Sequence, residues 1–436
     1  MMKKNRTIYF LLALVCLGLQ SCLFQEEDYF DDSSANRATA DVKRCSELLE
    51  AAPNGWVMEY YVGKDYSLGG ITLLCKFDGQ RVTMASQIAG ADETVSSLYS
   101  VKSEQATMLS FDTYNYLVHY FGQPQGSMAD DPNGTLGGDY EFVISDATAD
   151  RIELKGKKYG NRIVMKAFSA DQTWKQYLTR IKKVENDAFF YEYDLRMDGL
   201  YTGQMLRSNY TFIVTYYDEV GKVHQKTVPF MFTTGGMRFH EPVTIDGQTM
   251  QNFVWKNEEI SFVCTDEGAT GVKMKGIYID GYQSYDYYPG TYLMDFYRLN
   301  GATNQLEVAS QEIQLVKNED GKSYWLKGLE YDILVTYDKP RGGLSILPQF
   351  LKKVQGGYVY LAMWDLMNDY VLRSSAIGLI SYPTTDGIYL VDNGVWIGEI
   401  SGFIFGVYNS QDEEASFMGY TDAVAAIRLV KKTIEE

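Results

Sequence analysis

The chain has 436 residues and a formal net charge of −17 at pH 7, because 57 Asp and Glu outnumber 40 Lys and Arg. This charge argues against nucleic acid as a partner, since nucleic-acid binding depends on Lys and Arg that neutralise phosphates. The length exceeds what one ordinary hydrophobic core serves, so we expect two or three domains.

Residues 1–21 have the pattern of a bacterial signal peptide. Lys3, Lys4 and Arg6 precede an almost wholly apolar run from Ile8 to Leu19. That run is shorter than the ~20 residues that span a bilayer, and it fits the hydrophobic region of an export signal. It ends in a Leu-x-Ser-Cys sequence that looks like a lipobox. We therefore expect Cys22 to be acylated and to hold the protein on a lipid bilayer; the alternative is an ordinary signal with a chance Cys.

Residues 22–40 form a predicted lipidated acidic tether. Glu26, Glu27 and Asp28 place negative charge close to Cys22. This resembles the acidic tag that directs lipoproteins of Bacteroidota to the outer face of the outer membrane. The expected location is the outer membrane, with the protein lipid-anchored and facing the cell exterior. A merely solvated acidic tether is the alternative.

The rest of the chain predicts a mainly β protein. Its 35 Tyr, 21 Phe and 39 Gly favour strands and tight turns. Asp78-Gly79, between two apolar runs, is a strong hairpin signal. The spacing of strand-like segments indicates β-barrel or β-sandwich domains. We assign an N-terminal β-rich domain to residues 41–185 and a C-terminal all-β region to residues 186–436, with two subdomains in that region as an open alternative.

Two short helices are predicted among the strands. The first covers Asn36–Ala51 and stops before a Pro-Asn-Gly sequence. The second covers Asp171–Glu185, with Asp171 as its N-cap and an apolar stripe that starts at Trp174. The predicted domain boundary lies at the end of this second helix.

Sparse cysteines and histidines argue against a cofactor or a metal. Cys45, Cys75 and Cys264 show neither a disulfide framework nor a zinc pattern, and the latter two read as buried small hydrophobic residues. The acidic turn at Asp130 fails the EF-hand spacing, because Pro132 falls where a ligand is needed. We therefore predict no metal site and no cofactor.

Sequence signatures of catalysis are missing as well. The chain has only 3 His and no HExxH, GxSxG, Walker or Rossmann motif. His119 sits in an apolar segment, which favours a packed structural role. Glycoside hydrolysis needs two carboxylates at a set separation, and the sequence does not select a pair. We predict no enzyme and no catalytic residue.

Several segments of the first half together resemble a known family. The ordered set consists of Ala51–Trp56, Phe77–Gly79, Leu109–Asn115, Gly137–Phe142 and Leu154–Lys158. In that order they are similar to domain-of-unknown-function family 4302, a group of Bacteroidota lipoproteins, most closely over residues 40–170. The resemblance implies no established activity and no catalytic residues. It implies an accessory role beside TonB-dependent nutrient-uptake systems, and thus an outer-membrane transporter complex as partner. For the first half we expect a lipocalin-like barrel.

The segment Ile277–Gly290 carries the ligand-binding candidates. Five tyrosines are interleaved there with Asp, Gln, Gly and Pro. Flat aromatic faces beside polar groups suit a sugar or peptide ligand. The alternative is a Tyr-rich hairpin whose rings pack over a neighbouring sheet. The candidate residues are Tyr278, Tyr282, Tyr285, Tyr287 and Tyr288.

Three hypotheses of function follow. The first is a non-catalytic module that captures a glycan or peptide nutrient for a TonB-dependent uptake complex. The second is a structural adhesin or pilus-type subunit, in which the strand at Ala425–Lys431 would complete another subunit's sheet. The third is a hydrolase.

Overall fold

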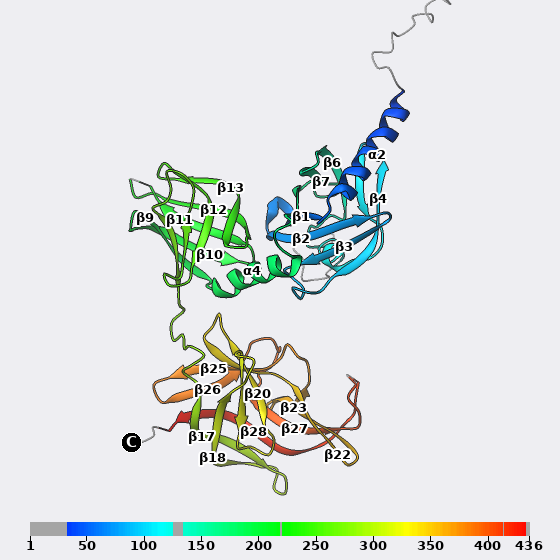
Figure 1. Ribbon diagram of the computed structural model, residues 1–436. Coiled ribbons are helices and arrows are strands. Elements are labelled where there is room, and N and C mark those ends of the chain that lie inside the picture. The colour runs from blue at the N-terminus through cyan, green and yellow to red at the C-terminus, as the bar shows by residue number, and fades with distance from the viewer. Residues whose placement is uncertain (1–32, 125–133, 219, 413, 433–436) are drawn as a thin grey trace, which may run out of the picture. The chain divides into compact units, whose positions relative to one another are not determined.

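The structure is a computed structural model that describes residues 33–124, 134–218, 220–412 and 414–432 (Figure 1). The predicted signal peptide, Cys22, Glu26, Glu27, Asp28 and the turn at Asp130 lie outside the described residues. Within the described ranges, no helix is long and apolar enough to cross a membrane.

Helix α2 (Ser34–Ala51) confirms the first predicted helix, which begins at Ser34 rather than Asn36. Its N-cap is Ser33, whose hydroxyl oxygen accepts from the Asn36 N–H at 3.2 Å. Leu49 is buried on the inner face of the helix, and its carbonyl accepts from the Trp56 indole at 2.9 Å. The helix is therefore part of the first core.

The first eight strands form a closed antiparallel barrel, named barrel 1 here (Figure 1). Each strand pairs with the next in the chain, and β1 pairs with β8 to close the ring. The predicted barrel in the first half is confirmed as an up-and-down barrel, the arrangement of lipocalin-like folds. The strands are β1 (Trp56–Val62), β2 (Gly69–Asp78), β3 (Arg81–Ser86), β4 (Val95–Ser103), β5 (Thr107–Phe111), β6 (Glu141–Ala147), β7 (Arg151–Gly156) and β8 (Arg162–Ala167).

Barrel 1 has a packed interior. Trp56, Tyr60, Phe111 and Phe142 are among its largest fully buried side chains. An eight-stranded barrel is just wide enough for side chains to fill. Cys75 also lies in this core and, with Cys45 and Cys264, is free and buried.

Helix α4 (Trp174–Asp187) confirms the second predicted helix, but Asp171 is not its N-cap. Thr173 is the cap: its hydroxyl accepts from the Gln176 N–H at 3.2 Å, and the Gln176 side chain accepts from the Thr173 N–H at 2.9 Å. This reciprocal pair is a capping box. Asp171 instead accepts from the Ser169 hydroxyl at 2.5 Å.

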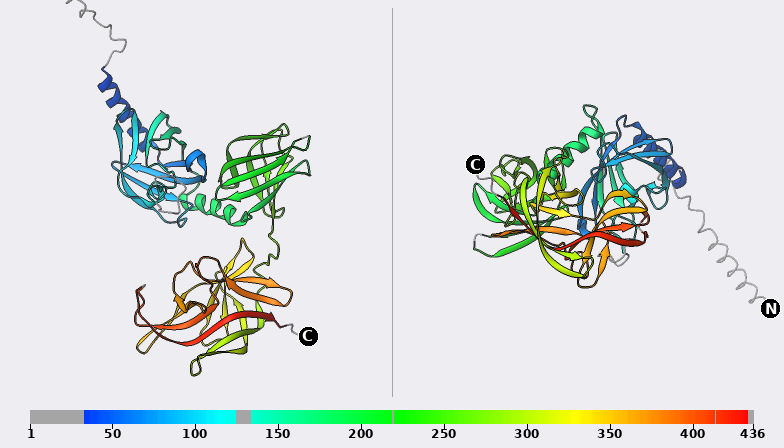
Figure 2. Two further views of the ribbon diagram at one scale, coloured as in Figure 1. Left: turned by 180° about the vertical axis from the view of Figure 1, so that it is seen from behind. Right: turned by 90° about the horizontal axis from the view of Figure 1, so that it is seen from below.

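Helix α4 also joins two barrels (Figure 2). The Lys182 ammonium donates to the carbonyls of Gln87 at 2.8 Å and Ala89 at 2.6 Å, beside barrel 1. One turn further on, Glu185 accepts from the Tyr210 hydroxyl at 2.6 Å, beside the second barrel.

Barrel 2 repeats the architecture of barrel 1. Its strands follow the chain order, and β9 pairs with β16 and β10 to close the ring. Phe212, Phe230, Phe232 and Phe239 fill its interior and are fully buried. The strands are β9 (Glu192–Met197), β10 (Leu200–Ser208), β11 (Thr211–Tyr217), β12 (Val223–Phe232), β13 (Gly236–Ile245), β14 (Gln248–Lys256), β15 (Ser261–Cys264) and β16 (Val272–Ile277).

The last twelve strands belong to one sheet. An additional pairing of β17 with β28 joins the ends of the run β17-β18-β19-β20-β21-β25-β26-β28, which makes a third ring, and β27, β23, β22 and β24 extend it. The strands are β17 (Gly290–Asn300), β18 (Gln305–Lys317), β19 (Ser323–Lys327), β20 (Ile333–Asp338), β21 (Gly343–Ile346), β22 (Gln349–Val354), β23 (Gly357–Asp365), β24 (Tyr370–Leu372), β25 (Leu379–Thr384), β26 (Gly387–Asp392), β27 (Gly402–Tyr408) and β28 (Phe417–Lys431).

Strand β28 contains the segment Ala425–Lys431 that was considered as a donor strand. It pairs with β17 along one edge and with β26 and β27 along the other. Both edges are thus used inside the protein's own sheet.

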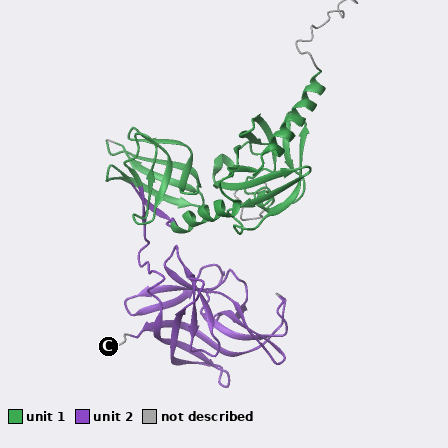
Figure 3. Ribbon diagram, in the orientation of Figure 1, with its two compact units in different colours: residues 1–187, 196–273 green, residues 188–195, 274–436 purple. Residues whose placement is uncertain are grey.

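The chain divides into two compact units (Figure 3). Unit 1 contains residues 1–187 and 196–273, and unit 2 contains residues 188–195 and 274–436. The predicted boundary near residue 186 falls at the end of α4, between barrel 1 and barrel 2. The mainly β prediction, with barrels and two short helices, is confirmed; a single-turn helix, α3 (Tyr116–His119), was not predicted.

Candidate functional site

The candidate site begins on the outer wall of barrel 1. In β8, Ile163 and Met165 are buried inside the barrel, so the alternating residues Arg162, Val164 and Lys166 face outward. The register places Lys166 beside Arg151 of β7. Two neighbouring strands thus present three basic side chains on one surface.

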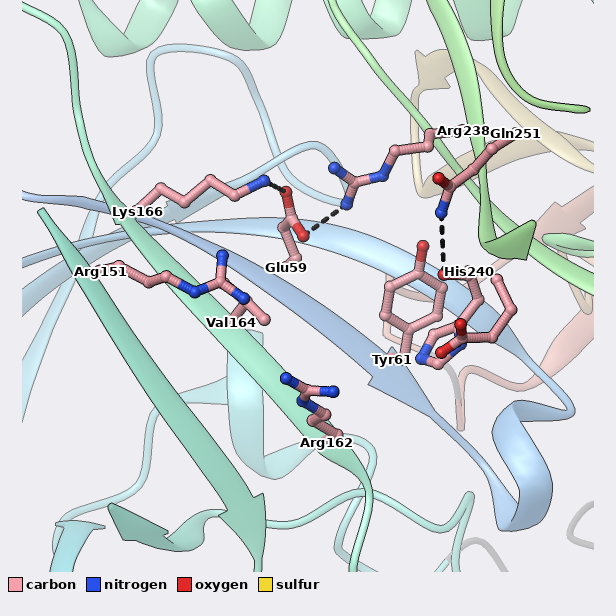
Figure 4. Close-up of a pocket in the computed structure, with 10 residues that line it drawn as sticks. Glu59, Tyr61, Arg151, Arg162, Val164, Lys166, Arg238, His240 and Gln251 are labelled. Carbon is pink, nitrogen blue, oxygen red and sulfur yellow. Dashed lines mark hydrogen bonds and ion pairs between the residues drawn. The ribbon is translucent and has the colours of Figure 1, made fainter. Parts of the chain in front are cut away.

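Strand β1 adds a carboxylate to this surface. Glu59 pairs in register with Val164, and its side chain is only 13% exposed. It accepts from Lys166 at 2.7 Å and forms a second ion pair with Arg238 of β13 in barrel 2 (Figure 4). Burial alone would raise the pKa of Glu59, but Arg238 and Lys166 outweigh it, and the pKa lies below its usual value. Glu59 is therefore an ionised link between the two barrels.

A pocket of about 240 Å³ lies between these two walls, inside unit 1. Arg151, Arg162, Lys166 and Arg238 line it, against the two lining carboxylates of Glu59 and Glu241. Figure 4 shows Arg151 and Arg162 on the barrel 1 side, across from Arg238. The lining side chains therefore carry more positive than negative charge.

Arg151 and Arg162 share one further carboxylate. Glu153 of β7 accepts from Arg151 at 3.0 Å and from Arg162 at 2.9 Å. Arg162 nevertheless stays 61% exposed and Arg151 40% exposed. Both guanidinium groups thus keep donors that a ligand can reach.

Two aromatic side chains, Tyr61 of barrel 1 and His240 of barrel 2, also line the pocket. The His240 ring stacks on Tyr66 at a centroid distance of 4.0 Å and meets the Tyr61 ring edge-on at 4.4 Å. Burial lowers the pKa of His240, so its imidazole is neutral at pH 7. The Tyr61 hydroxyl is buried close to Arg238, another residue of the pocket lining.

This arrangement suits the binding of an anion. Arg side chains present planar pairs of donors that match carboxylate, sulfate or phosphate oxygens.

The described residues contain no cluster of three or more His, Cys, Asp or Glu side chains that could hold a metal ion. His119 stacks on Tyr140 at 4.7 Å, and its Nδ1 lies 3.1 Å from the Asn115 N–H, as a packed structural histidine does.

Two of the five candidate tyrosines are occupied in packing. Tyr288 is 1% exposed, and its hydroxyl donates to the Gly342 carbonyl at 2.8 Å. The half-buried Tyr285 ring stacks on Tyr324 at 4.7 Å, and its hydroxyl donates to the Ser323 carbonyl at 2.9 Å. These rings stabilise unit 2 from within.

The other three candidates keep part of their surface open. Tyr278 is 45% exposed and contacts the half-buried Tyr282 at a centroid distance of 4.4 Å. Phe189 stacks on Tyr282 at 6.0 Å. Tyr287 is 40% exposed, with the Lys431 ammonium 5.0 Å from its ring centroid. The five tyrosines therefore do not share one open surface.

Comparison with known proteins assigns the family. The model of a domain of unknown function, DUF4302, matches residues 26–257, which are more than half of the chain and include barrel 1 and strands β9 to β14 of barrel 2. The chain belongs to the DUF4302 family. A second domain of unknown function, DUF4987, matches residues 265–391. The family match extends well past residues 40–170, where the sequence resemblance was clearest.

Other comparisons add no function to this DUF4302 protein. No curated protein matches it. One solved structure, a DUF3598-family protein of unknown function from Nostoc punctiforme, is 8% identical and covers 56% of this chain and 98% of its own. Its TM-score of 0.15 is too low to support an argument.

The basic pocket of this DUF4302 protein was missed by the sequence reasoning. Its side chains come from β1, from β7 and β8, and from β13 and β14, three parts that are far apart in the chain. One local signal was present: Arg162 and Lys166 alternate with the apolar Ile163 and Met165, which indicates a strand with a basic outer face.

Proposed function

We propose that this DUF4302 protein is a non-catalytic capture protein, lipid-anchored on the outer cell surface, whose inter-barrel pocket binds the acidic group of a ligand. The observation that carries the proposal is the convergence of Arg151, Arg162, Lys166 and Arg238 on one pocket of a chain with a net charge of −17. A local excess of positive charge on an acidic protein favours the binding of acidic ligands over neutral ligands.

The size of the pocket narrows the ligand. Sites for whole drug-sized molecules usually have ~300–1,000 Å³. At about 240 Å³, this pocket holds one charged group or one acidic sugar residue, with the rest of a larger ligand outside. A sugar carboxylate or sulfate, at the end or side of a glycan, fits this description.

The anchoring part of the proposal has separate support. A basic region, an apolar run and a Leu-x-Ser-Cys sequence stand in the order of a lipoprotein signal, and acidic residues follow Cys22. A capture protein on that surface would deliver its ligand to an outer-membrane transporter of the TonB-dependent class.

The binding claim is tested by calorimetry with a matched ligand pair. Residues 23–436 are titrated with methyl glucuronide and with methyl glucoside, which differ in one carboxylate. We expect the glucuronide alone to bind, and Arg162→Ala to weaken it at least tenfold, about 1.4 kcal/mol. The control is Lys175→Ala. Lys175 lies on α4, pairs with Asp92 and is 66% exposed, so this variant should bind the glucuronide normally. Equal binding of the two sugars, or full binding by Arg162→Ala, contradicts the proposal.

The anchor is tested in cells. Labelled fatty acid should be incorporated into the wild-type protein and not into Cys22→Ala. Protease added to intact cells should digest the wild-type protein. Survival of the protein until the outer membrane is broken would place it on the periplasmic side.

A further inference from the structure

A second pocket, of about 460 Å³, lies in unit 2, where strands β21 and β25 separate. These strands pair at Ser345–Ile380 and Ile346–Leu379 only. One residue further on, the Leu344 N–H donates to the Ser381 hydroxyl oxygen at 2.7 Å instead of to a backbone carbonyl. The two strands thus open into a pocket whose other walls are residues 279–281, Asp338, Arg341 and Gly342.

The walls of this pocket are firmly held. Gly342 has a φ of +60°, and a Cβ there would lie 2.5 Å from Tyr282 Cδ2, so only glycine fits against that ring. The Tyr337 hydroxyl donates to the Gln283 carbonyl at 2.8 Å and lies 3.1 Å from the Tyr282 hydroxyl. Tyr282 of the segment Ile277–Gly290, held by Tyr337 of β20, therefore supports this wall of the pocket.

The lining combines apolar surface with a few polar groups. Ile279, Leu344, Ile380, Tyr382 and Pro383 supply the apolar part, and Tyr382 is 61% exposed. The charges of the polar part decide the class of ligand. A mostly apolar lining with few convergent polar groups is typical of small-molecule sites.

The charged groups are two carboxylates and one guanidinium. Arg341 Nε lies 3.7 Å from an Asp338 carboxylate oxygen, so this pair is already balanced. The exposed Asp280 forms no ion pair or hydrogen bond with any other residue that the structure describes. The pocket therefore offers one carboxylate without a partner among the described residues and a net negative charge, the opposite of the pocket between the barrels.

We infer that this pocket binds an uncharged pyranose residue. The C–H face of a sugar ring packs on an aromatic side chain such as Tyr382, and its hydroxyls donate to a carboxylate such as Asp280. The negative lining disfavours the acidic ligands proposed for the first pocket. This second site goes beyond that proposed function and does not depend on it.

Saturation-transfer NMR tests the inference with residues 23–436 and a panel of uncharged sugars: maltotriose, cellotriose, mannobiose, lactose and N,N′-diacetylchitobiose. We expect at least one sugar to receive saturation. Tyr382→Ala and the isosteric Asp280→Asn should each lower that signal about fivefold or more. Tyr370→Ala, a 54% exposed tyrosine outside the pocket, is the matched control and should keep the full signal.

The outcomes separate the two sites. Sugar binding at this pocket should be unchanged in Arg162→Ala, and glucuronide binding should be unchanged in Tyr382→Ala. A panel without any signal overturns the inference, and so does a signal that survives both Tyr382→Ala and Asp280→Asn. Binding of a lysine-containing peptide in place of every sugar would likewise overturn it and assign Asp280 to an amine.

Discussion

Barrel 1 and barrel 2 have the same strand order, but their outer walls carry different side chains. The β7–β8–β1 wall of barrel 1 is charged, with Arg162 and Lys166 facing out. The β10–β11–β12 wall of barrel 2 is largely apolar or neutral: Leu206 pairs with Ile213, and they are 42% and 36% exposed. The same topology thus presents two different surfaces.

The interiors of the two barrels, by contrast, are alike. Phe142 in barrel 1 and Phe230 in barrel 2 are both fully buried in a core of large apolar side chains. A lipocalin-like barrel that holds a ligand needs an open interior. Because both interiors are filled, we place the proposed binding on the outside of these barrels.

The largest expected effect tests the packed interiors. Phe142→Ala and Phe230→Ala should each lower the free energy of unfolding by about 3–5 kcal/mol, because each leaves a cavity in a close-packed core. Denaturant unfolding measures both, and Leu206→Ala on the outer wall is the control, with a loss within about 0.5 kcal/mol. A small loss in either Phe variant would indicate a loose, ligand-sized interior.

A smaller effect tests the charged wall. Glu59→Gln should lower the free energy of unfolding by about 1–3 kcal/mol, because Lys166 and Arg238 lose their shared carboxylate. The same change leaves the pocket more positive, so methyl glucuronide should bind more tightly. Thermal melting and calorimetry measure the two effects. Tighter binding with lower stability supports the assigned roles; weaker binding would mean that Glu59 contacts the ligand.

The helix that joins the barrels should show an effect of about 1 kcal/mol. Thr173→Ala removes the N-cap of α4, and capping substitutions of this kind cost about that much. Asp171→Ala, at the position favoured by the sequence, should cost less, because Asp171 does not cap the helix. If Asp171→Ala were the more destabilising variant in thermal melts, the cap assignment would be wrong.

The smallest expected effect is the change with pH, near neutrality, of the contribution that Glu59 makes to stability. Its pKa is lowered in the folded protein, so its contribution to stability is complete above its unfolded pKa of about 4.3. The contribution is lost as pH falls through the lowered folded pKa. Melting temperatures of wild type and Glu59→Gln should therefore converge on acidification and stay apart from pH 5 to pH 8. Convergence already at pH 7 would contradict an ionised Glu59.

Local patterns predicted the elements of this fold well. The apolar stripe from Trp174 and the turn at Asp78-Gly79 depend on neighbouring residues, and both elements formed where the sequence placed them. The capping residue was misassigned because Thr173 and Asp171 are both good caps, and only the Gln176 contact distinguishes them.

The basic pocket could not be predicted in the same way. It depends on which strand of barrel 2 lies against β1 and β8, and Arg238 is 179 residues from Glu59. The packing of the tyrosine segment could not be predicted for a related reason. Its composition indicates rings near a ligand, but the buried positions of Tyr285 and Tyr288 follow from strands that the chain adds later.

Diffraction can show whether an anion binds outside barrel 1, as we propose. Crystals of residues 23–436 grown with selenate, a sulfate analogue with an anomalous signal, would locate the anion without assumptions about a larger ligand. We expect a selenium peak within hydrogen-bond reach of Arg151 and Arg162, and its loss in crystals of Arg162→Ala. A pocket without a peak, while selenate occupies other sites on the same molecule, would contradict it.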